Sequence, residues 1–399
     1  MATKTETRLR FSVALSQEAD AAEAGHALAQ AVRNGLGAGK VDLAFLFFSS
    51  HYAKEAEALC AAVRRELTPG LLVGCTGEGV IAGAEELETQ SAVTLWAARM
   101  PDVTLTPLRL SSPQGAEGLT IHGWPEGLGT QREKPAFILL ADPFSTPVDE
   151  VLAVLADRCP GSAAIGGLAG GGHDVGENRL ILNDEVYDGG LVGVALSGRI
   201  AVRMVVSQGC RPIGEPYVVT KAEQNVIHEL GGVPALDRLQ TLFESLGGDE
   251  RRIAQRALHL GIVIDEHRDR FERGDFLVRN LIGADRGSGS VAIGDQVQEG
   301  QTVQFHLRDA QSASEDLNLL LAADRSIHQA PLGALLFCCC GRGRGLFGRP
   351  HHDITAVRER EGDVPIAGFF AQGEIGPVGG GNFLHGYTAS LALFSEPSP

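Results

Sequence analysis

One pattern of elements occurs three times along the chain, and it constrains the fold more than any other feature. Each copy has an apolar strand, a helix, a glycine-rich strand and a second apolar strand. The copies are residues 41–100 (copy 1), 135–198 (copy 2) and 333–394 (copy 3). Short apolar runs that alternate with helical stretches are typical of α/β proteins. We therefore predict an α/β fold of mixed β-sheets with helices on the outer faces, in two packed halves that contain this repeated strand–helix–strand–strand unit.

The expected elements of the three copies can be aligned one by one. The predicted helices are 52–67, 147–159 and 352–361, the glycine-rich strands are 70–81, 161–172 and 364–376, and the last strands are 91–100, 189–198 and 387–394. "VGCTGEGVI" in copy 1 resembles "AGFFAQGEIG" in copy 3. Internal duplication and the ordinary alternation of α/β proteins both explain this likeness.

Charge and composition exclude several classes of function. The net charge is −16, from 34 basic and 50 acidic residues, so we expect no nucleic-acid or membrane partner. The first residues contain too short an apolar run for a secretion signal, and no later segment offers about 18 uncharged apolar residues. Seven cysteines, an odd number, do not suggest a disulfide framework. We therefore expect a cytoplasmic protein with reduced thiols.

Several motifs together resemble those of one protein family. They are "PGLLVGCTGEGVI" (69–81), "FLVRNLIGAD" (276–285), "ALLFCCCGRGRGLFG" (334–348), "VPIAGFFAQGEIGP" (364–377) and "GNFLHGYTASLALF" (381–394). In order and spacing the chain resembles FIST proteins, which carry FIST N and FIST C domains in tandem. The resemblance implies an N-terminal strand and helix in 1–35, a FIST N domain in 36–204 and a FIST C domain in 205–396.

The resemblance also implies a function. FIST proteins are thought to be sensory modules of signal transduction that bind small ligands, with amino acids and their derivatives the usual suggestion. Relatives occur attached to bacterial signalling domains and, in eukaryotes, beside an F-box. We recognise no kinase, cyclase or methyl-accepting segment in this chain, so we expect a separate signalling protein as its partner.

Three consecutive cysteines end the first strand of copy 3. Adjacent cysteines do not supply the gapped ligand pairs of a zinc site, and His351 and His352 have no second cluster to join, so we predict no metal. Cys340 lies at the strand end beside Arg342, which would favour its thiolate. A catalytic role for Cys340 would need an oriented base, for which His385 is the candidate.

The loop after these cysteines is rich in glycine and arginine. It matches a dinucleotide-binding spacing at Gly343, Gly345 and Gly348, but the acidic residue that should end the next strand is missing, so we expect no such cofactor. Free backbone N–H groups and guanidinium groups suit a carboxylate or phosphate instead. The loop residues that we predict to bind such an anion are Gly341, Arg342, Gly343 and Arg344. Alternatively, Arg342 pairs with an acid of the protein, such as Glu374.

The carboxyl ends of the other strands complete a candidate site, because ligands of open α/β sheets lie beyond these ends. An amino-acid-like ligand needs an anion receptor, an acid for its ammonium group and neutral donors. The residues that would meet these needs are Arg342, Glu374 or Glu78, Thr76, Asn382 and Thr388. Alternatively, Glu78 and Glu374 bind backbone amides of the glycine turns beside them, and His385 is a packed histidine.

These observations favour a non-catalytic function. We expect a sensory protein that binds a small carboxylated metabolite, such as an amino acid or a derivative, and needs no cofactor. An enzyme of acyl-transfer or hydrolase type that uses Cys340 as its nucleophile is the first alternative. A protein-interaction scaffold is the second.

Overall fold

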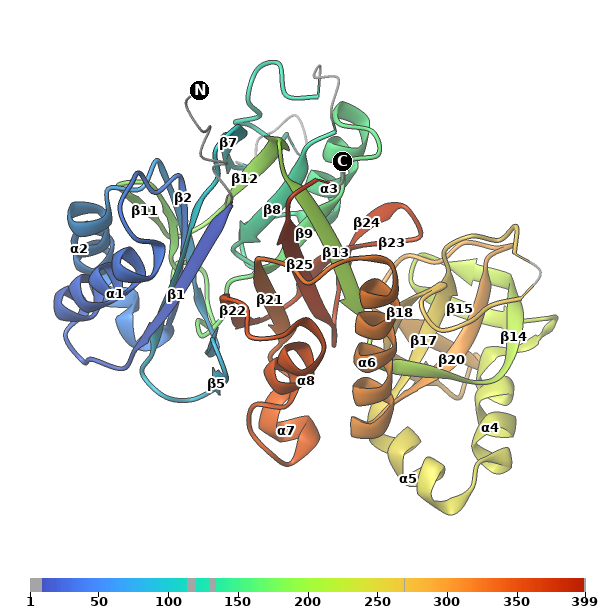
Figure 1. Cartoon of the computed structure of the whole chain (residues 1–399). Coiled ribbons are helices and arrows are strands. Elements are labelled where there is room, and N and C mark those ends of the chain that lie inside the picture. The colour runs from blue at the N-terminus through green and yellow to red at the C-terminus, as the bar shows by residue number, and fades with distance from the viewer. Residues whose placement is uncertain (1–8, 113–119, 130–133, 269, 398–399) are drawn as a thin grey trace. The chain divides into compact units, whose positions relative to one another are not determined.

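A computed structural model describes residues 9–112, 120–129, 134–268 and 270–397 of the chain (Figure 1). The chain divides into two compact units. Unit 1 comprises Met1–Val206 and Leu320–Pro399, and unit 2 comprises Ser207–Leu319. Unit 1 therefore contains all three copies, and unit 2 is inserted before copy 3.

Unit 1 holds three six-stranded sheets, each centred on the two parallel strands of one copy. In strand order, sheet 1 is β1 (Arg10–Ser16), β6 (Val93–Arg99), β2 (Leu43–Ser49), β3 (Leu71–Gly77), β10 (Leu180–Leu182) and β11 (Glu185–Tyr187). Sheet 2 is β7 (Val103–Leu110), β12 (Leu191–Gly198), β8 (Ala136–Ala141), β9 (Ala164–Leu168), β23 (Glu374–Val378) and β24 (Gly381–His385). Sheet 3 is β13 (Ala201–Ser207), β25 (Ala389–Ser395), β21 (Gly333–Cys339), β22 (Ile366–Ala371), β4 (Val80–Ala82) and β5 (Glu85–Leu87).

The three copies exchange hairpins in a ring. The hairpin β4–β5 of copy 1 pairs with β22 of copy 3, β23–β24 of copy 3 pairs with β9 of copy 2, and β10–β11 of copy 2 pairs with β3 of copy 1. The glycine-rich strands predicted at 70–81 and 364–376 are each divided in two by this exchange, since β4 and β23 leave for another sheet. No copy can complete its sheet alone, so the three copies must fold together.

One glycine of each copy fixes the register of its parallel strands. The three glycines face the carbonyl oxygen of a leucine on the neighbouring strand, and a Cβ atom there would lie 2.3, 1.8 or 1.7 Å from that oxygen. In chain order the pairs are Gly74 with Leu46, Gly166 with Leu139, and Gly368 with Leu336. These glycines occupy equivalent positions, which gives the sequence repeat a counterpart in the packing.

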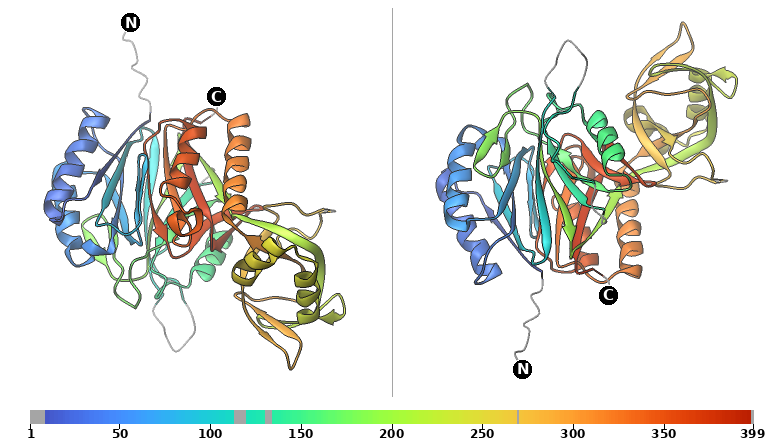
Figure 2. Two further views of the ribbon diagram at one scale, coloured as in Figure 1. Left: turned by 90° about the horizontal axis from the view of Figure 1, so that it is seen from below. Right: turned by 90° about the horizontal axis from the view of Figure 1, so that it is seen from above.

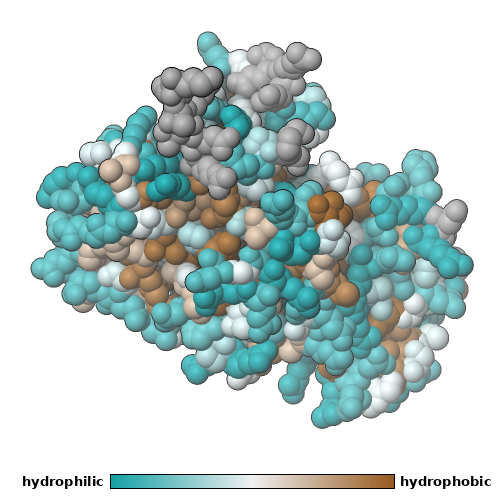
Figure 3. Space-filling view, viewed as in Figure 1, coloured by the Kyte–Doolittle hydropathy of each residue, from teal (hydrophilic) through white to brown (hydrophobic). Residues whose placement is uncertain are grey.

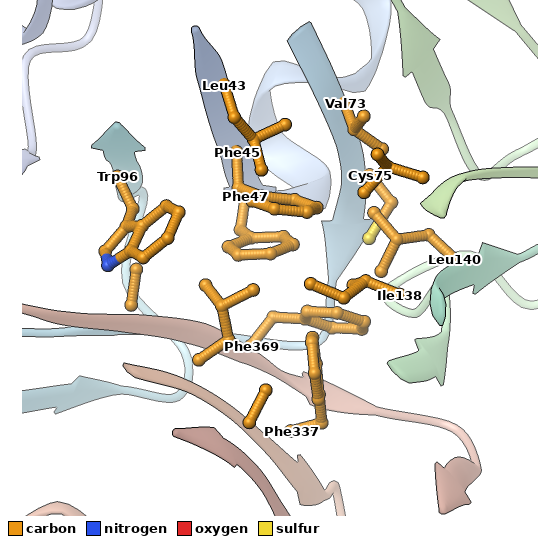
Figure 4. Packing of buried hydrophobic residues seen from close by; sticks show 14 of the residues in the cluster. Leu43, Phe45, Phe47, Val73, Cys75, Trp96, Ile138, Leu140, Phe337 and Phe369 are labelled. Carbon is orange, nitrogen blue, oxygen red and sulfur yellow. The ribbon is translucent and has the colours of Figure 1, made fainter. Parts of the chain in front are cut away.

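All three sheets contribute to one hydrophobic core (Figure 4). Phe47 of sheet 1 packs against Phe337 and Phe369 of sheet 3, with ring centroids 6.2 and 5.1 Å apart, and Ile138 and Leu140 of sheet 2 belong to the same cluster. The central strands have apolar side chains on both faces, as in β2, where every residue is buried. Such continuous apolar runs are typical of sheets covered on both sides.

Helices cover the outer faces of the sheets (Figures 1 and 2). The pair α1 (Ala21–Leu36) and α2 (Ala56–Leu67) packs on sheet 1, and the Asp20 side chain caps α1 by accepting the Glu23 N–H. The outward surface of this pair is mainly hydrophilic (Figure 3). The helix α3 (Val148–Arg158) contacts β24 of sheet 2. This architecture confirms the predicted mixed α/β fold.

Two further helices of unit 1 follow the first strand of copy 3. They are α7 (Gly343–Phe347) and α8 (His352–Glu361), and α8 has the limits that the sequence predicts. The boundary between the units falls within α6 (Ala310–Ile327). None of the helices among the described residues is long and apolar enough to cross a membrane.

Unit 2 contains one seven-stranded antiparallel sheet. Its strands, in order, are β14 (Cys210–Glu223), β20 (Thr302–Arg308), β17 (Leu258–Val263), β18 (Phe276–Asp285), β19 (Ser290–Ile293), β15 (Val226–Leu230) and β16 (Val233–Pro234). An added pairing of β14 with β15 closes the sheet into a barrel. The helices α4 (Ala235–Ser245) and α5 (Gly248–Ala257) complete its core of aliphatic and aromatic side chains.

Candidate functional site

The ends of β3, β9 and β22 meet at one place in unit 1. The N–H groups of Gly170, Gln372 and Glu78 donate to carbonyl oxygens of β3, β9 and β22, at 3.1, 3.2 and 3.0 Å. Each of these bonds joins one copy to the next, so they form a ring. The ring gathers the first residues after three strands that are far apart in the sequence. Backbone pairing alone therefore assembles a site at this point.

Two of the gathered side chains are polar, and glycines surround them. The Glu78 side chain is exposed, and its Oε2 accepts the N–H of Gly171 at 3.1 Å. The Gln372 amide donates to the carbonyl of Gly172 at 3.0 Å. Gly171 has a φ of 85°, and a Cβ atom there would lie 2.8 Å from Ser50, so only glycine fits. The glycine turn therefore holds both polar side chains in place.

Cys340 follows β21 directly and borders this ring. Its N–H donates to the Ala371 carbonyl of β22 at 2.9 Å, and its side chain is exposed. A hydrogen bond with the Cys339 thiol lowers the pKa of Cys340, although burial and the carboxylates of Glu374 and Glu78 act in the opposite direction. Cys340 is therefore an accessible thiol whose pKa lies below the ordinary value of a cysteine.

Glu374 lies beneath this surface as a fully buried carboxyl group. Its Oε2 accepts the N–H of Thr388 at 3.0 Å and the Thr388 hydroxyl at 2.8 Å, while its Oε1 has no hydrogen-bond partner among the described residues. Burial raises the pKa of Glu374 well above its ordinary value, helped by Cys339 and opposed by the bonds from Thr388. Burial therefore favours the neutral form of this carboxyl group over its carboxylate.

Arg342 is not directed at solvent. Its side chain is fully buried, and it donates to both oxygens of Asp353, with Nε–Oδ2 at 2.6 Å and Nη2–Oδ1 at 2.8 Å. Its Nη1 donates to the Tyr387 carbonyl at 3.3 Å. Arg342 therefore pairs with an acid of the protein, as the alternative prediction has it, but this acid is Asp353 rather than Glu374. Arg342 presents no anion receptor to a ligand.

The glycine–arginine loop does bind an anion, and that anion is part of the protein. The N–H of Arg344 donates to Oε1 of Glu88 at 2.9 Å, and a Cβ atom at Gly343 would lie 2.7 Å from the Glu88 carboxyl carbon. Gly343 has a φ of 60°, which also requires glycine. The predicted chemistry of the loop is therefore present, with Glu88 in the place of a ligand. Arg344 itself extends into solvent.

Of the remaining predicted residues, Thr76, His385 and Thr388 are buried, Asn382 is half-buried and Gly341 is exposed. Thr76 is buried, and its hydroxyl accepts the Arg179 N–H at 3.1 Å. Asn382 joins β24 to copy 2, through the Ala164 N–H at 2.8 Å and the Ser162 carbonyl at 2.9 Å. His385 is buried and donates from Nε2 to the Gly376 carbonyl at 3.0 Å. The structure thus assembles Glu78, Cys340 and Glu374, while Thr76 and Asn382 make structural contacts.

Sequence reasoning missed three acids that organise this region. Asp353 holds Arg342, Glu88 holds the loop, and Glu86 accepts the Ile354 N–H at 2.7 Å at the start of α8. The position of Asp353 in the first turn of a helix and the acidic run "EELE" (85–88) are the only signals that could have identified them. The described residues contain no group of three or more His, Cys, Asp or Glu that could hold a metal ion.

The fold and the site define an α/β protein in which three hairpin-exchanging copies surround one core and present polar groups at their joined strand ends. Family comparison then identifies it. The FIST N domain matches residues 42–233 and the FIST C domain matches residues 235–377, so the chain belongs to the FIST family. The predicted resemblance is thus confirmed, and FIST domains are associated with sensory signal transduction and small-ligand binding.

Similar proteins occur in mycobacteria. "Uncharacterized protein Rv0628c" of Mycobacterium tuberculosis (strain ATCC 25618 / H37Rv) is 42% identical over 389 residues, which cover 97% of this chain and 100% of that protein. "Uncharacterized protein Mb0898c" of Mycobacterium bovis is 40% identical over 391 residues, which cover 97% of this chain and 99% of that protein. These alignments cover 97% of the chain and thus extend over both of its FIST domains.

Proposed function

We propose that this chain is a small-ligand-binding sensory protein, and that its ligand is a carboxylated metabolite such as an amino acid or a derivative. The single observation that carries this proposal is the ring of strand ends. It places an exposed carboxylate, Glu78, near an exposed thiol, Cys340, on glycine backbone that leaves room for close approach. A cytoplasmic location and a separate signalling protein as partner belong to the same proposal.

Two exposed charges, Glu78 at the ring and Arg344 on the loop that follows Cys340, suit the two ends of an amino acid. The Glu78 carboxylate uses Oε2 for the Gly171 N–H, and its Oε1 accepts no hydrogen bond from a described residue, so it can accept an ammonium group. The exposed guanidinium of Arg344 has no partner among the described residues and can donate two parallel hydrogen bonds to a carboxylate. We therefore assign the carboxylate to Arg344, because Arg342 is occupied by Asp353.

The test is a thermal-shift and calorimetric screen of amino acids and their derivatives with the full chain. A ligand at one hundred times its Kd should add about 2.7 kcal/mol to the free energy of unfolding. Glu78→Gln should weaken the binding of amino acids and of the amines made from them by decarboxylation. Arg344→Gln should weaken the binding of amino acids and of the acids made from them by deamination. Glu85→Gln and Arg349→Gln, which alter exposed residues near the same region, are the matched controls. Absence of any stabilising compound, or unchanged affinity in both site variants, would refute the proposal.

The enzyme alternative has one supporting observation, the accessible thiol of Cys340 with its lowered pKa. The groups that shift this pKa are a thiol and two carboxylates, whereas the His385 that we expected as the base donates one ring N–H to Gly376. Cys340→Ala separates the two functions. A receptor should keep its ligand affinity within a few-fold, whereas an enzyme that uses this nucleophile should lose turnover of activated esters.

A further inference from the structure

Cys339 and Cys340 are adjacent thiols in very different environments. The chain has seven cysteines, and the structure describes all of them. Six are buried, including Cys339, and Cys340 is exposed. An accessible thiol therefore has a protected thiol as its direct neighbour in the sequence. Reagents from solvent can therefore reach the Cys340 thiol directly, whereas the fold covers the Cys339 thiol.

The two side chains also interact. A hydrogen bond between the thiols lowers the pKa of Cys340, and the Sγ atom of Cys339 accepts the Gly341 N–H at 3.4 Å. This hydrogen bond brings the thiols of two neighbouring residues into contact at the strand end. The residue that follows β21 is in a turn, so the pair is not held in the alternating geometry of a continuous strand.

Comparison with the other two copies shows that the fold does not require a thiol at the position of Cys339. The strand registers align Cys339 with Ser49 of copy 1 and Asp142 of copy 2, and all three are buried. Ser49 and Asp142 each accept a backbone N–H through an oxygen atom, at 3.2 Å in both cases. Cys339 accepts the N–H of Gly341, two residues on, as Asp142 accepts that of Phe144, but it does so through sulfur, which is a weaker acceptor. The other two copies fill this position with an oxygen-bearing side chain, so the fold does not dictate a thiol here.

We propose that Cys339 and Cys340 form a redox-active vicinal dithiol that is oxidised by low-molecular-weight disulfides. The thiolate of Cys340 attacks one sulfur of the disulfide RSSR, which forms a mixed disulfide and releases one thiolate. The Cys339 thiol then gives its proton to solvent and attacks Sγ of Cys340, which releases the second thiolate and closes the Cys339–Cys340 bond. The protein loses two electrons and two protons, and RSSR is reduced to two RSH. This inference does not depend on the proposed ligand function.

The experiment treats the full-length protein with 2-hydroxyethyl disulfide and follows it by intact mass and fragment mapping. The wild type should lose two hydrogens, with the new bond between residues 339 and 340. Cys339→Ser should stop at one hydroxyethylthio adduct on Cys340, and Cys340→Ser should react at least about tenfold more slowly. Cys338→Ala and Cys159→Ala, which alter buried thiols, should behave as the wild type does. Tryptophan fluorescence checks that each variant is folded.

Three outcomes would overturn the inference. In the first, the folded wild type does not react, or Cys340→Ser reacts at the same rate. In the second, the wild type accumulates a stable mixed disulfide, which excludes Cys339 as the resolving thiol. In the third, Cys338→Ala abolishes ring closure, which would assign the bond to Cys338 instead. Reductant should restore the original mass of the wild type, and ligand affinity measured in parallel reports separately on the proposed function.

Discussion

Replacement of Arg342 by leucine is the change that best separates a folding role from a ligand-binding role. The guanidinium and the Asp353 carboxylate are 0% and 1% exposed and make two hydrogen bonds to each other. If Arg342 were a ligand receptor, the variant would stay stable and lose only affinity. In this structure the variant leaves a buried carboxylate without its cation, so we expect a loss of stability.

The size of this loss follows from the burial of the pair. Removal of one partner of a buried ion pair costs about 3–5 kcal/mol, because the remaining charge stays uncompensated in the interior. Arg342→Leu also loses the bond to the Tyr387 carbonyl and the contact with the Phe347 ring, whose centroid lies 5.4 Å from the guanidinium carbon. The His352 ring, 3.0 Å from Asp353, offers only partial compensation. We therefore expect a decrease of about 4 kcal/mol at pH 7.

The decrease should depend on pH in a defined direction. Burial raises the pKa of Asp353, but the charge and hydrogen bonds of Arg342 outweigh it and hold the pKa well below its usual range. The pair therefore contributes stability above a pH of about 4, the ordinary pKa of aspartate, and loses it as the pH falls through the lowered value. Without Arg342, burial dominates and the pKa of Asp353 rises. The carboxyl group can then fold in its neutral form, so the variant should be destabilised less at pH 4.5 than at pH 7.

Tryptophan fluorescence during denaturant unfolding measures this change selectively. The chain has two tryptophans, Trp96 and Trp124, and both belong to unit 1, as does the ion pair. Arg349→Leu, which removes an exposed arginine of the same segment, is the control. Adding Asp353→Leu to the variant should recover part of the stability. A decrease below about 1 kcal/mol, or an equal decrease at both pH values, would refute the reasoning.

Three further changes test other parts of unit 1. Burial raises the pKa of Glu86 to about 7, so the stabilising contribution of Glu86 is complete below the ordinary glutamate pKa and is lost as the pH rises through 7. In the same unfolding assay, Glu86→Gln should therefore be more stable than the wild type by about 3 kcal/mol at pH 8. At pH 4.5 the two proteins should have similar stability. Gly368→Ala would place a Cβ atom 1.7 Å from the Leu336 carbonyl oxygen and should cost about 3 kcal/mol or more, whereas Gly345→Ala, with nothing within 4 Å, should change thermal stability little. Glu88→Gln replaces a charged acceptor of the Arg344 N–H by a neutral one and should lower the hydrogen-exchange protection of that amide by about 1 kcal/mol; unchanged protection would contradict the role of Glu88.

Local patterns predicted the elements of the fold well. The helix predicted at 352–361 has these limits in the structure, and β2 and β21 are the first strands that the pattern predicts for copies 1 and 3. These elements have strong apolar patterns and clear ends. The exchanged hairpins were not predictable, because β4 and β10 have three residues each and pair with strands of other copies. Such short strands carry no pattern that identifies a distant partner.

The partners in the site could not be predicted for a related reason. The sequence predicts that Arg342 and the loop bind an anion, and in the structure both do bind a carboxylate group. It could not show that Asp353 and Glu88 fill these places, since Glu88 precedes Arg344 by 256 residues. Propensity and periodicity describe neighbours along the chain, whereas the partner that a charged group binds depends on contacts between distant parts of the chain.

Comparison of the three copies locates the chemistry of the site more sharply than any single residue does. The registers align Glu374 with Val80 and Leu180, and all three side chains are fully buried. The fold therefore needs an apolar side chain at this position, and a carboxyl group there costs desolvation that the other copies avoid. On another strand, Cys339 has a sulfur atom where its counterparts in copies 1 and 2 have an oxygen atom. Both departures occur in copy 3 and lie next to Cys340, the exposed thiol. Copy 3 therefore carries the two buried groups that packing does not explain, and copy 1 adds the exposed carboxylate of Glu78.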